Sequence, residues 1–146
     1  LTDLNTLLRT ADIASIHCAL TPPFESHPNY HLIGEEELNQ MKETAIIVNT
    51  ARGAIIDEIA LIRALREKRI SGAALDVFDP DPPRRNNPLF DLENVIVTPH
   101  MAGMTYESIE KLGMKVAEET TSILKGKPPR NLINPDVVKL PHQESF

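Results

Sequence analysis

The sequence predicts an α/β fold in which helices alternate with the strands of a parallel sheet. Apolar residues recur at helical spacing in several segments, and short runs rich in β-branched residues lie between these segments. The runs are continuously apolar rather than alternating, which is typical of strands buried on both faces by helices. Helices and strands that take turns along the chain favour a parallel sheet.

The first half of the chain contains two predicted helix–strand pairs. Leucines at helical spacing over residues 4–11 are followed by the apolar run "IASIHC" at 13–18. The segment 34–41 begins with acidic residues, which suit the positive N-terminal end of a helix. The run "AIIVN" at 45–49 has the length of a strand.

The second half predicts one more helix–strand pair, a further strand and a long helix. Asp57 is the predicted N-cap of a helix over 58–68, whose apolar residues form one stripe. The runs at 72–77 and 94–98 predict two strands. A last helix is predicted from Thr105 to Gly126, because a glycine followed by prolines commonly ends a helix.

Composition excludes several classes of protein. The chain has 146 residues, 41% of them hydrophobic, which is enough for one core. A net charge of -6 with scattered basic residues argues against a nucleic-acid interface. The single cysteine rules out an internal disulfide, and no apolar run approaches the roughly 18 residues of a membrane span. We therefore expect a cytoplasmic protein, and the initial Leu indicates a piece of a longer one.

Loops at the carboxyl ends of the strands are the expected place for function. Ligands of open α/β sheets bind in the crevice beyond those ends. The predicted loops are residues 19–33, 50–56, 78–93 and 99–104, and they contain residues of distinct chemistry. An arginine, an aspartate between prolines and a histidine lie in the last three.

Four motifs at these ends, "HCALT", "NTARG", "DVFDPDP" and "TPHMAG", together resemble the D-2-hydroxyacid dehydrogenase family. The resemblance covers nearly the whole chain, and the order and spacing of the motifs agree with it. It implies the second half of a Rossmann-like, doubly wound parallel sheet. Residues 1–126 would form a partial NAD(P)-binding domain, and 127–146 a C-terminal return segment.

The resemblance implies a catalytic set of Arg52, Asp81 and His100. Arg52 would bind the substrate carboxylate, since a guanidinium makes two charge-assisted hydrogen bonds to it. His100 would act as the acid/base, because its ordinary pKa lies near neutrality. Asp81 would orient the imidazole and favour its charged form. Singly, each residue could instead be a salt-bridged or solvated loop side chain.

The cofactor would be NAD or NADP, with NAD favoured. Asp76 would contact the nicotinamide carboxamide, the alternative being a turn cap, whereas Asp79 is expected to be solvated. Cys18 is predicted to be an apolar wall rather than a nucleophile. No metal is expected, although His27 and His31 are four apart. The implied cofactor-binding residues are His17, Cys18, Ala19, Thr21, Thr50, Ala51, Arg52, Asp76, His100, Ala102 and Gly103.

The sequence departs from the family in three respects. The G-x-G-x-x-G turn that binds a pyrophosphate is absent, so we expect the chain alone neither to bind NAD tightly nor to turn over. The segment 22–31 is longer than usual. Asp81 stands where the family commonly has glutamate, and one methylene fewer shortens the side chain by about 1.5 Å. Either its loop lies closer to His100, or a water connects the two.

The predicted function is therefore that of an oxidoreductase acting on a small 2-oxo acid and its D-2-hydroxy acid. Glyoxylate, hydroxypyruvate, pyruvate and phosphoglycerate-type acids are candidate substrates by resemblance. A homodimer is expected, again by resemblance. Two alternatives stay open: a cofactor-binding module similar to the family's transcriptional corepressors, and an inactive truncated remnant.

Overall fold

The computed structural model describes residues 1–21 and 28–134 and divides the chain into two compact units. Unit 1 is Leu1–Ala102 and unit 2 is Gly103–Phe146, and each is described by itself. The expected division into 1–126 and 127–146 stays a prediction. Most of the predicted elements lie in unit 1.

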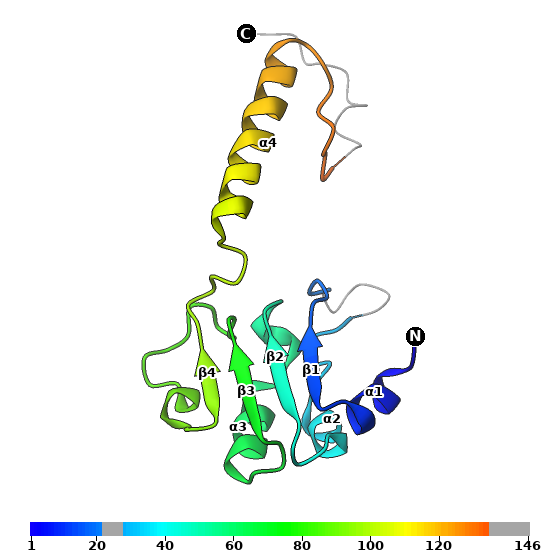
Figure 1. The fold of residues 1–146 in the computed structure, drawn as a ribbon, viewed down its shortest axis with the longest axis vertical. Coiled ribbons are helices and arrows are strands. Elements are labelled where there is room, and N and C mark those ends of the chain that lie inside the picture. Colours follow the sequence, from blue (N-terminus) through cyan, green and yellow to red (C-terminus); the bar gives the residue numbers. More distant parts are fainter. Residues whose placement is uncertain (22–27, 135–146) are drawn as a thin grey trace. The chain divides into compact units, whose positions relative to one another are not determined.

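Unit 1 contains a four-stranded parallel sheet (Figure 1), which confirms the predicted fold class. Its strands are β1 (Ile13–Ile16), β2 (Ile46–Asn49), β3 (Gly72–Leu75) and β4 (Val95–Val97), in the spatial order β1-β2-β3-β4. Each lies within a predicted run. Because all four are parallel, their carboxyl ends lie along one edge of the sheet, which we call the carboxyl edge.

Three helices pack on one face of this sheet. They are α1 (Leu4–Thr10), α2 (Glu35–Gln40) and α3 (Glu58–Arg66). Asp57 caps α3 as predicted, since its Oδ1 accepts hydrogen bonds from the backbone of Ile59 and Ala60. Side chains from the helices and the strands form a single core, which includes Leu8, Leu38, Ile47, Leu61, Leu65, Ala73 and Leu75.

Among the described residues of unit 1, no helix lies on the opposite face of the sheet. Ile13, Ile46 and Ile96 are 63%, 37% and 70% exposed there. The expected burial of both faces is therefore not met inside this unit. Right-handed crossovers that always advance in the same direction along the sheet put α2 and α3 on the same side, which explains why one face stays open.

Unit 2 begins with a connecting turn and continues into α4 (Tyr106–Leu124). Thr105 is the N-cap, and its Oγ1 accepts a hydrogen bond from the Ser108 amide. The helix ends at Leu124 with Lys125 as its C-cap, and Gly126 closes it with a φ of 71° and an amide that donates to the carbonyl of Ile123. Both predicted ends are confirmed. No helix of the described ranges is long and apolar enough to cross a bilayer.

Two short 3-10 helices lie inside segments that the sequence predicts as loops. They are η1 (Gly53–Ile55), after β2, and η2 (Pro88–Asp91), before β4. Asn87 caps η2 by accepting a hydrogen bond from the Leu89 amide. Each turn packs one buried residue into the core, Ile55 in η1 and Leu89 in η2, and so anchors the loop that precedes it.

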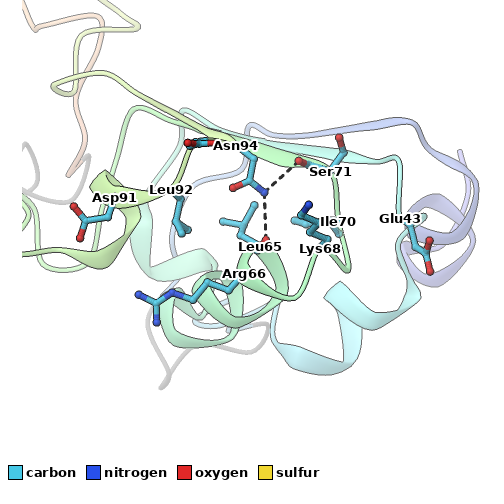
Figure 2. A pocket seen from close by; sticks show the side chains of 10 residues that line it. Glu43, Leu65, Arg66, Lys68, Ile70, Ser71, Asp91, Leu92 and Asn94 are labelled. Atoms are coloured by element: carbon cyan, nitrogen blue, oxygen red, sulfur yellow. Dashed lines mark hydrogen bonds between the residues drawn. The ribbon is translucent and has the colours of Figure 1, made fainter.

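A cleft of about 690 Å³ lies at the amino ends of β3 and β4 (Figure 2). Asn94 lies within it and donates hydrogen bonds to the carbonyls of Leu65 and Ser71, both at 3.3 Å. Acidic and basic side chains are mixed around the cleft, and none of the predicted site residues lines it. The two hydrogen bonds of Asn94 connect the end of α3 to the starts of β3 and β4.

Candidate functional site

The turn after β2 is held by the side chain of Asn49, the last residue of that strand. Asn49 is 1% exposed, accepts a hydrogen bond from the Ala51 amide at 3.0 Å and donates to the Arg52 carbonyl at 2.9 Å. A buried amide that uses both of its polar atoms in this way fixes the backbone around it. Residues 50–52 therefore leave the sheet with a defined geometry.

Arg52 has an exposed side chain at the end of this turn. Its Nη1 donates to the Ala51 carbonyl at 2.6 Å. Within the described residues it makes no ion pair or hydrogen bond with Asp81 or His100. The guanidinium thus keeps most of its donors available to a ligand.

Gly53 brings the turn after β2 against the segment that follows β3. A Cβ on Gly53 would lie 2.0 Å from both the carbonyl carbon and the oxygen of Phe78, and 2.6 Å from the Asp79 nitrogen. These are backbone atoms, so only glycine permits the contact. Arg52 and Asp81 consequently lie on two loops that touch near their bases.

A second cleft, of about 400 Å³, opens between the ends of β1 and β2, and we call it the β1–β2 cleft. Its lining residues are His17, Cys18, Ala19, Leu20, Thr50, Ala51 and Arg52. All but Leu20 belong to the predicted cofactor-binding set. Thr21 lies just beyond and donates its amide to Asn29 Oδ1 at 2.7 Å.

Asn29 connects the lengthened segment back to this wall. Its Nδ2 donates to the Ala19 carbonyl at 2.7 Å and approaches Cys18 Sγ at 3.6 Å. Cys18 is exposed and lines the β1–β2 cleft. Residues 22–27 of the lengthened segment, with His27, lie outside the described residues; among the described ones no His, Cys, Asp or Glu cluster could hold a metal ion.

Asp76, directly after β3, holds the loop that carries His100. Asp76 is 3% exposed, and its carboxylate accepts hydrogen bonds from Thr98 Oγ1 at 2.5 Å and from the Met101 and Ala102 amides at 2.8 Å each. Burial opposes ionisation, but these hydrogen bonds and the nearby His100 ring outweigh it and lower the Asp76 pKa. Asp76 is therefore an anion that fixes the backbone on both sides of the turn.

His100 has a φ of 53°, a left-handed conformation that is unusual for any residue except glycine. Its Nδ1 lies 2.7 Å from Asp81 Oδ2, and the two side chains are 52% and 31% exposed. The contact is direct, so the loop carrying the shorter aspartate lies close enough to meet the ring. The Asp79–Pro80 and Asp81–Pro82 peptide bonds in this loop are cis.

The predicted residues therefore fall into three groups along the carboxyl edge. Asp81 and His100 form a pair, Asp76 and Ala102 are joined by a hydrogen bond, and Arg52 shares the β1–β2 cleft with the predicted cofactor wall. Gly103 is the first residue of unit 2, and a Cβ there would meet nothing within 4 Å. Sequence reasoning missed Asn49, whose signal was a polar residue ending an apolar strand.

Comparisons with known proteins show what the chain is similar to. Residues 1–102 match the family described as "D-isomer specific 2-hydroxyacid dehydrogenase, NAD binding domain". The glyoxylate reductase of Thermofilum pendens is 45% identical over 139 residues, covering 95% of this chain and 40% of that protein. The glyoxylate reductase of Aeropyrum pernix is 49% identical over 137 residues, covering 94% and 39%.

Solved structures show the same similarity. The NAD-complexed D-isomer-specific 2-hydroxyacid dehydrogenase of Lactobacillus delbrueckii ssp. bulgaricus superposes with a TM-score of 0.79 at 35% identity. The match covers 91% of this chain and 43% of that one. The 146 residues thus span about two fifths of the length of these relatives.

Proposed function

Since the chain belongs to the family of D-isomer-specific 2-hydroxyacid dehydrogenases through its NAD-binding domain, we propose that its carboxyl edge forms part of an oxidoreductase active site. The proposed reaction interconverts a small 2-oxo acid and its D-2-hydroxy acid. The observation that carries the proposal is the His100–Asp81 contact of 2.7 Å. A histidine oriented by a carboxylate is a suitable proton donor for a carbonyl oxygen.

His100 would transfer the proton in this reaction. With Nδ1 bonded to Asp81, Nε2 is the nitrogen that can give a proton to the substrate oxygen during reduction and take it back during oxidation. The Asp81 carboxylate fixes the orientation of the ring that gives this proton. When bound, the nicotinamide cofactor supplies or accepts the hydride at the substrate's second carbon.

Arg52 would bind the substrate carboxylate. Its side chain is exposed at the carboxyl edge, and only Nη1 has a hydrogen bond within the described residues. A guanidinium forms two parallel charge-assisted hydrogen bonds with a carboxylate, which fixes the orientation of the acid as well as its position. Substituting Arg52 should therefore raise KM for the acid.

The cofactor would lie along the β1–β2 cleft. This cleft combines small and apolar residues from two strand ends with the polar side chains of His17 and Arg52, a mixture that suits a nucleotide, which has apolar rings and polar groups. We propose NAD as the cofactor, because the matched family is an NAD-binding domain; NADP is the alternative. Asp76 keeps one lone-pair position for the carboxamide beside its three protein donors.

Glyoxylate is the first substrate to test, because the relatives from Thermofilum and Aeropyrum are named glyoxylate reductases. Hydroxypyruvate, pyruvate and phosphoglycerate-type acids are the further members of the panel. Each shares the 2-oxo or 2-hydroxy acid group that Arg52 and His100 would contact. The panel therefore tests the reaction and its substrate range together.

The experiment uses the full translation product that carries these 146 residues, with NADH or NADPH oxidation as the readout. We expect turnover with at least one acid, and a fall in kcat of roughly 10²–10⁴-fold in His100→Ala. Arg84→Ala is the control for Arg52→Ala, because it removes an exposed arginine from the loop that contains Asp81 and should leave KM for the acid unchanged. Turnover that is unaffected by His100→Ala refutes the mechanism. Tight NAD binding without turnover would instead support the interaction-module alternative.

We also propose that the protein associates as a homodimer in the cytoplasm. The open sheet face with Ile13, Ile46 and Ile96 is an apolar surface of the kind that favours association. Analytical ultracentrifugation of the full translation product tests this, and a monomer at all concentrations contradicts it.

A further inference from the structure

The loop that carries Asp81 has few contacts of its own. We call residues 78–87 the Asp81 loop. Its ends are buried, since Phe78 is 6% and Asn87 7% exposed, but Asp79 to Pro82 are exposed. For the described residues, the hydrogen bond to His100 is the one interaction of the Asp81 side chain. Something outside the loop must therefore hold Asp81 at 2.7 Å from the ring.

Glu58, the first residue of α3, contacts the Asp81 loop on both sides of Asp81. Its Oε1 accepts a hydrogen bond from Asn87 Nδ2 at 2.9 Å, and the backbone amide of Asp79 lies near enough to its carboxylate to act on the Glu58 pKa. Asn87 continues the connection, because its Oδ1 caps η2 at Leu89. One carboxylate from the helix layer thus joins the entry and the exit of the loop.

The environment of Glu58 is unfavourable to its charge. Partial burial raises the Glu58 pKa, while the hydrogen bond from Asn87 and the nearby Asp79 amide act against this rise and the Asp79 carboxylate adds to it. A carboxylate kept in such a place costs stability rather than adding it. Its presence is better explained by the two loop contacts than by stabilisation of the helix.

We infer that Glu58 is a positioning residue that holds the Asp81 loop so that Asp81 meets Nδ1 of His100. The catalytic meaning of this role rests on the proposed function, but the geometry does not. An aspartate has about 1.5 Å less reach than a glutamate, so a small drift of the loop opens the contact. A displacement of about 1 Å in an active site can cost roughly 100-fold in rate.

The test measures the tautomer of His100, which does not depend on turnover. Long-range proton–nitrogen NMR on the 146-residue chain, at about pH 9 where an imidazole is neutral, reports whether Nδ1 or Nε2 carries the proton. Asp81→Ala defines the ratio without a carboxylate acceptor. We expect Glu58→Ala to move the ratio about tenfold towards that of Asp81→Ala, the effect of losing a hydrogen bond of about 1.4 kcal/mol.

Three further variants separate positioning from a general effect on the fold. Glu58→Gln keeps an oxygen for Asn87 and should give an intermediate ratio. Glu36→Ala removes an exposed carboxylate from the first turn of α2, so it is the matched control and should leave the ratio unchanged. In an Asp81→Ala background, Glu58→Ala should have no additional effect.

The inference is overturned if Glu58→Ala and Glu58→Gln both keep the wild-type ratio of the two His100 tautomers. It is also overturned if Glu36→Ala shifts this ratio as much as Glu58→Ala does. Because no substrate is involved, this outcome is distinct from failure of the proposed function, which appears only in the turnover assay. In the full translation product, an active enzyme should lose kcat in Glu58→Gln while KM for the acid changes little, because Arg52 is left in place.

Discussion

Gly53→Ala is expected to separate two loops of the site and to destabilise unit 1. The added Cβ would lie 2.0 Å from Phe78 carbonyl atoms, whereas contacts between non-bonded heavy atoms need about 3.5 Å. The backbone must therefore move by about 1.5 Å. Overpacking of this kind typically costs about 1–3 kcal/mol, and the obstacle here is main chain rather than a flexible side chain.

Urea unfolding followed by circular dichroism measures the loss, and the His100 tautomer reports whether the Asp81 contact opens. Gly34→Ala is the matched control in unit 1, because a Cβ there would lie 3.4 Å from Glu37 Oε2 and 3.8 Å from the His31 carbonyl oxygen, both ordinary van der Waals contacts. We expect the control to lose less than about 1 kcal/mol, the cost of alanine at an N-cap. Equal unfolding midpoints for both variants would refute the steric argument.

Three other predictions concern single contacts. Burial raises the Asp76 pKa, but its hydrogen bonds outweigh burial and keep the folded pKa below the ordinary 3.8, so the ionised form stabilises the fold at neutral pH. The stability difference between wild type and Asp76→Asn should therefore shrink as the pH falls below 3.8. Asn49→Ala should cost about 2 kcal/mol and speed hydrogen exchange at the Ala51 amide, because two buried hydrogen bonds are lost. Gly126→Ala should cost about 1 kcal/mol in unit 2 alone, since its φ is 71°, and exchange at the end of α4 reports it.

Sequence reasoning succeeds where the cause of a structure is local. The ends of α4 follow from Thr105 and Gly126, whose roles as caps depend on neighbours in the chain. The four strands follow from apolar runs that match strand length. The pairing of Asp81 with His100 was inferred from a resemblance, and the structure brings those two side chains together.

The missed features depend on contacts between segments that are distant in the sequence. Glu58 looks like an ordinary first-turn acid of a helix until Asn87 and Asp79 lie against it. Gly53 resembles any loop glycine, because its neighbour Phe78 becomes close only when β2 and β3 pair. The open face of the sheet is likewise a consequence of strand order, which a list of apolar runs does not contain.

Asp81→Glu tests whether the backbone of the Asp81 loop is held at one distance from His100 or adjusts to the length of the side chain. Asp81 already contacts His100 at 2.7 Å, so an added methylene gives about 1.5 Å of excess reach at a fixed backbone. The glutamate must then bend into a poorer rotamer, at about 0.5–1.5 kcal/mol, or push the loop away from Glu58 and Gly53. We expect the ratio of the Nδ1–H to the Nε2–H form of His100 to decrease about two- to tenfold. An increase in the ratio of the Nδ1–H to the Nε2–H form would mean that the Asp81 loop adjusts freely to the longer side chain. Glu58 would then not hold this loop in place.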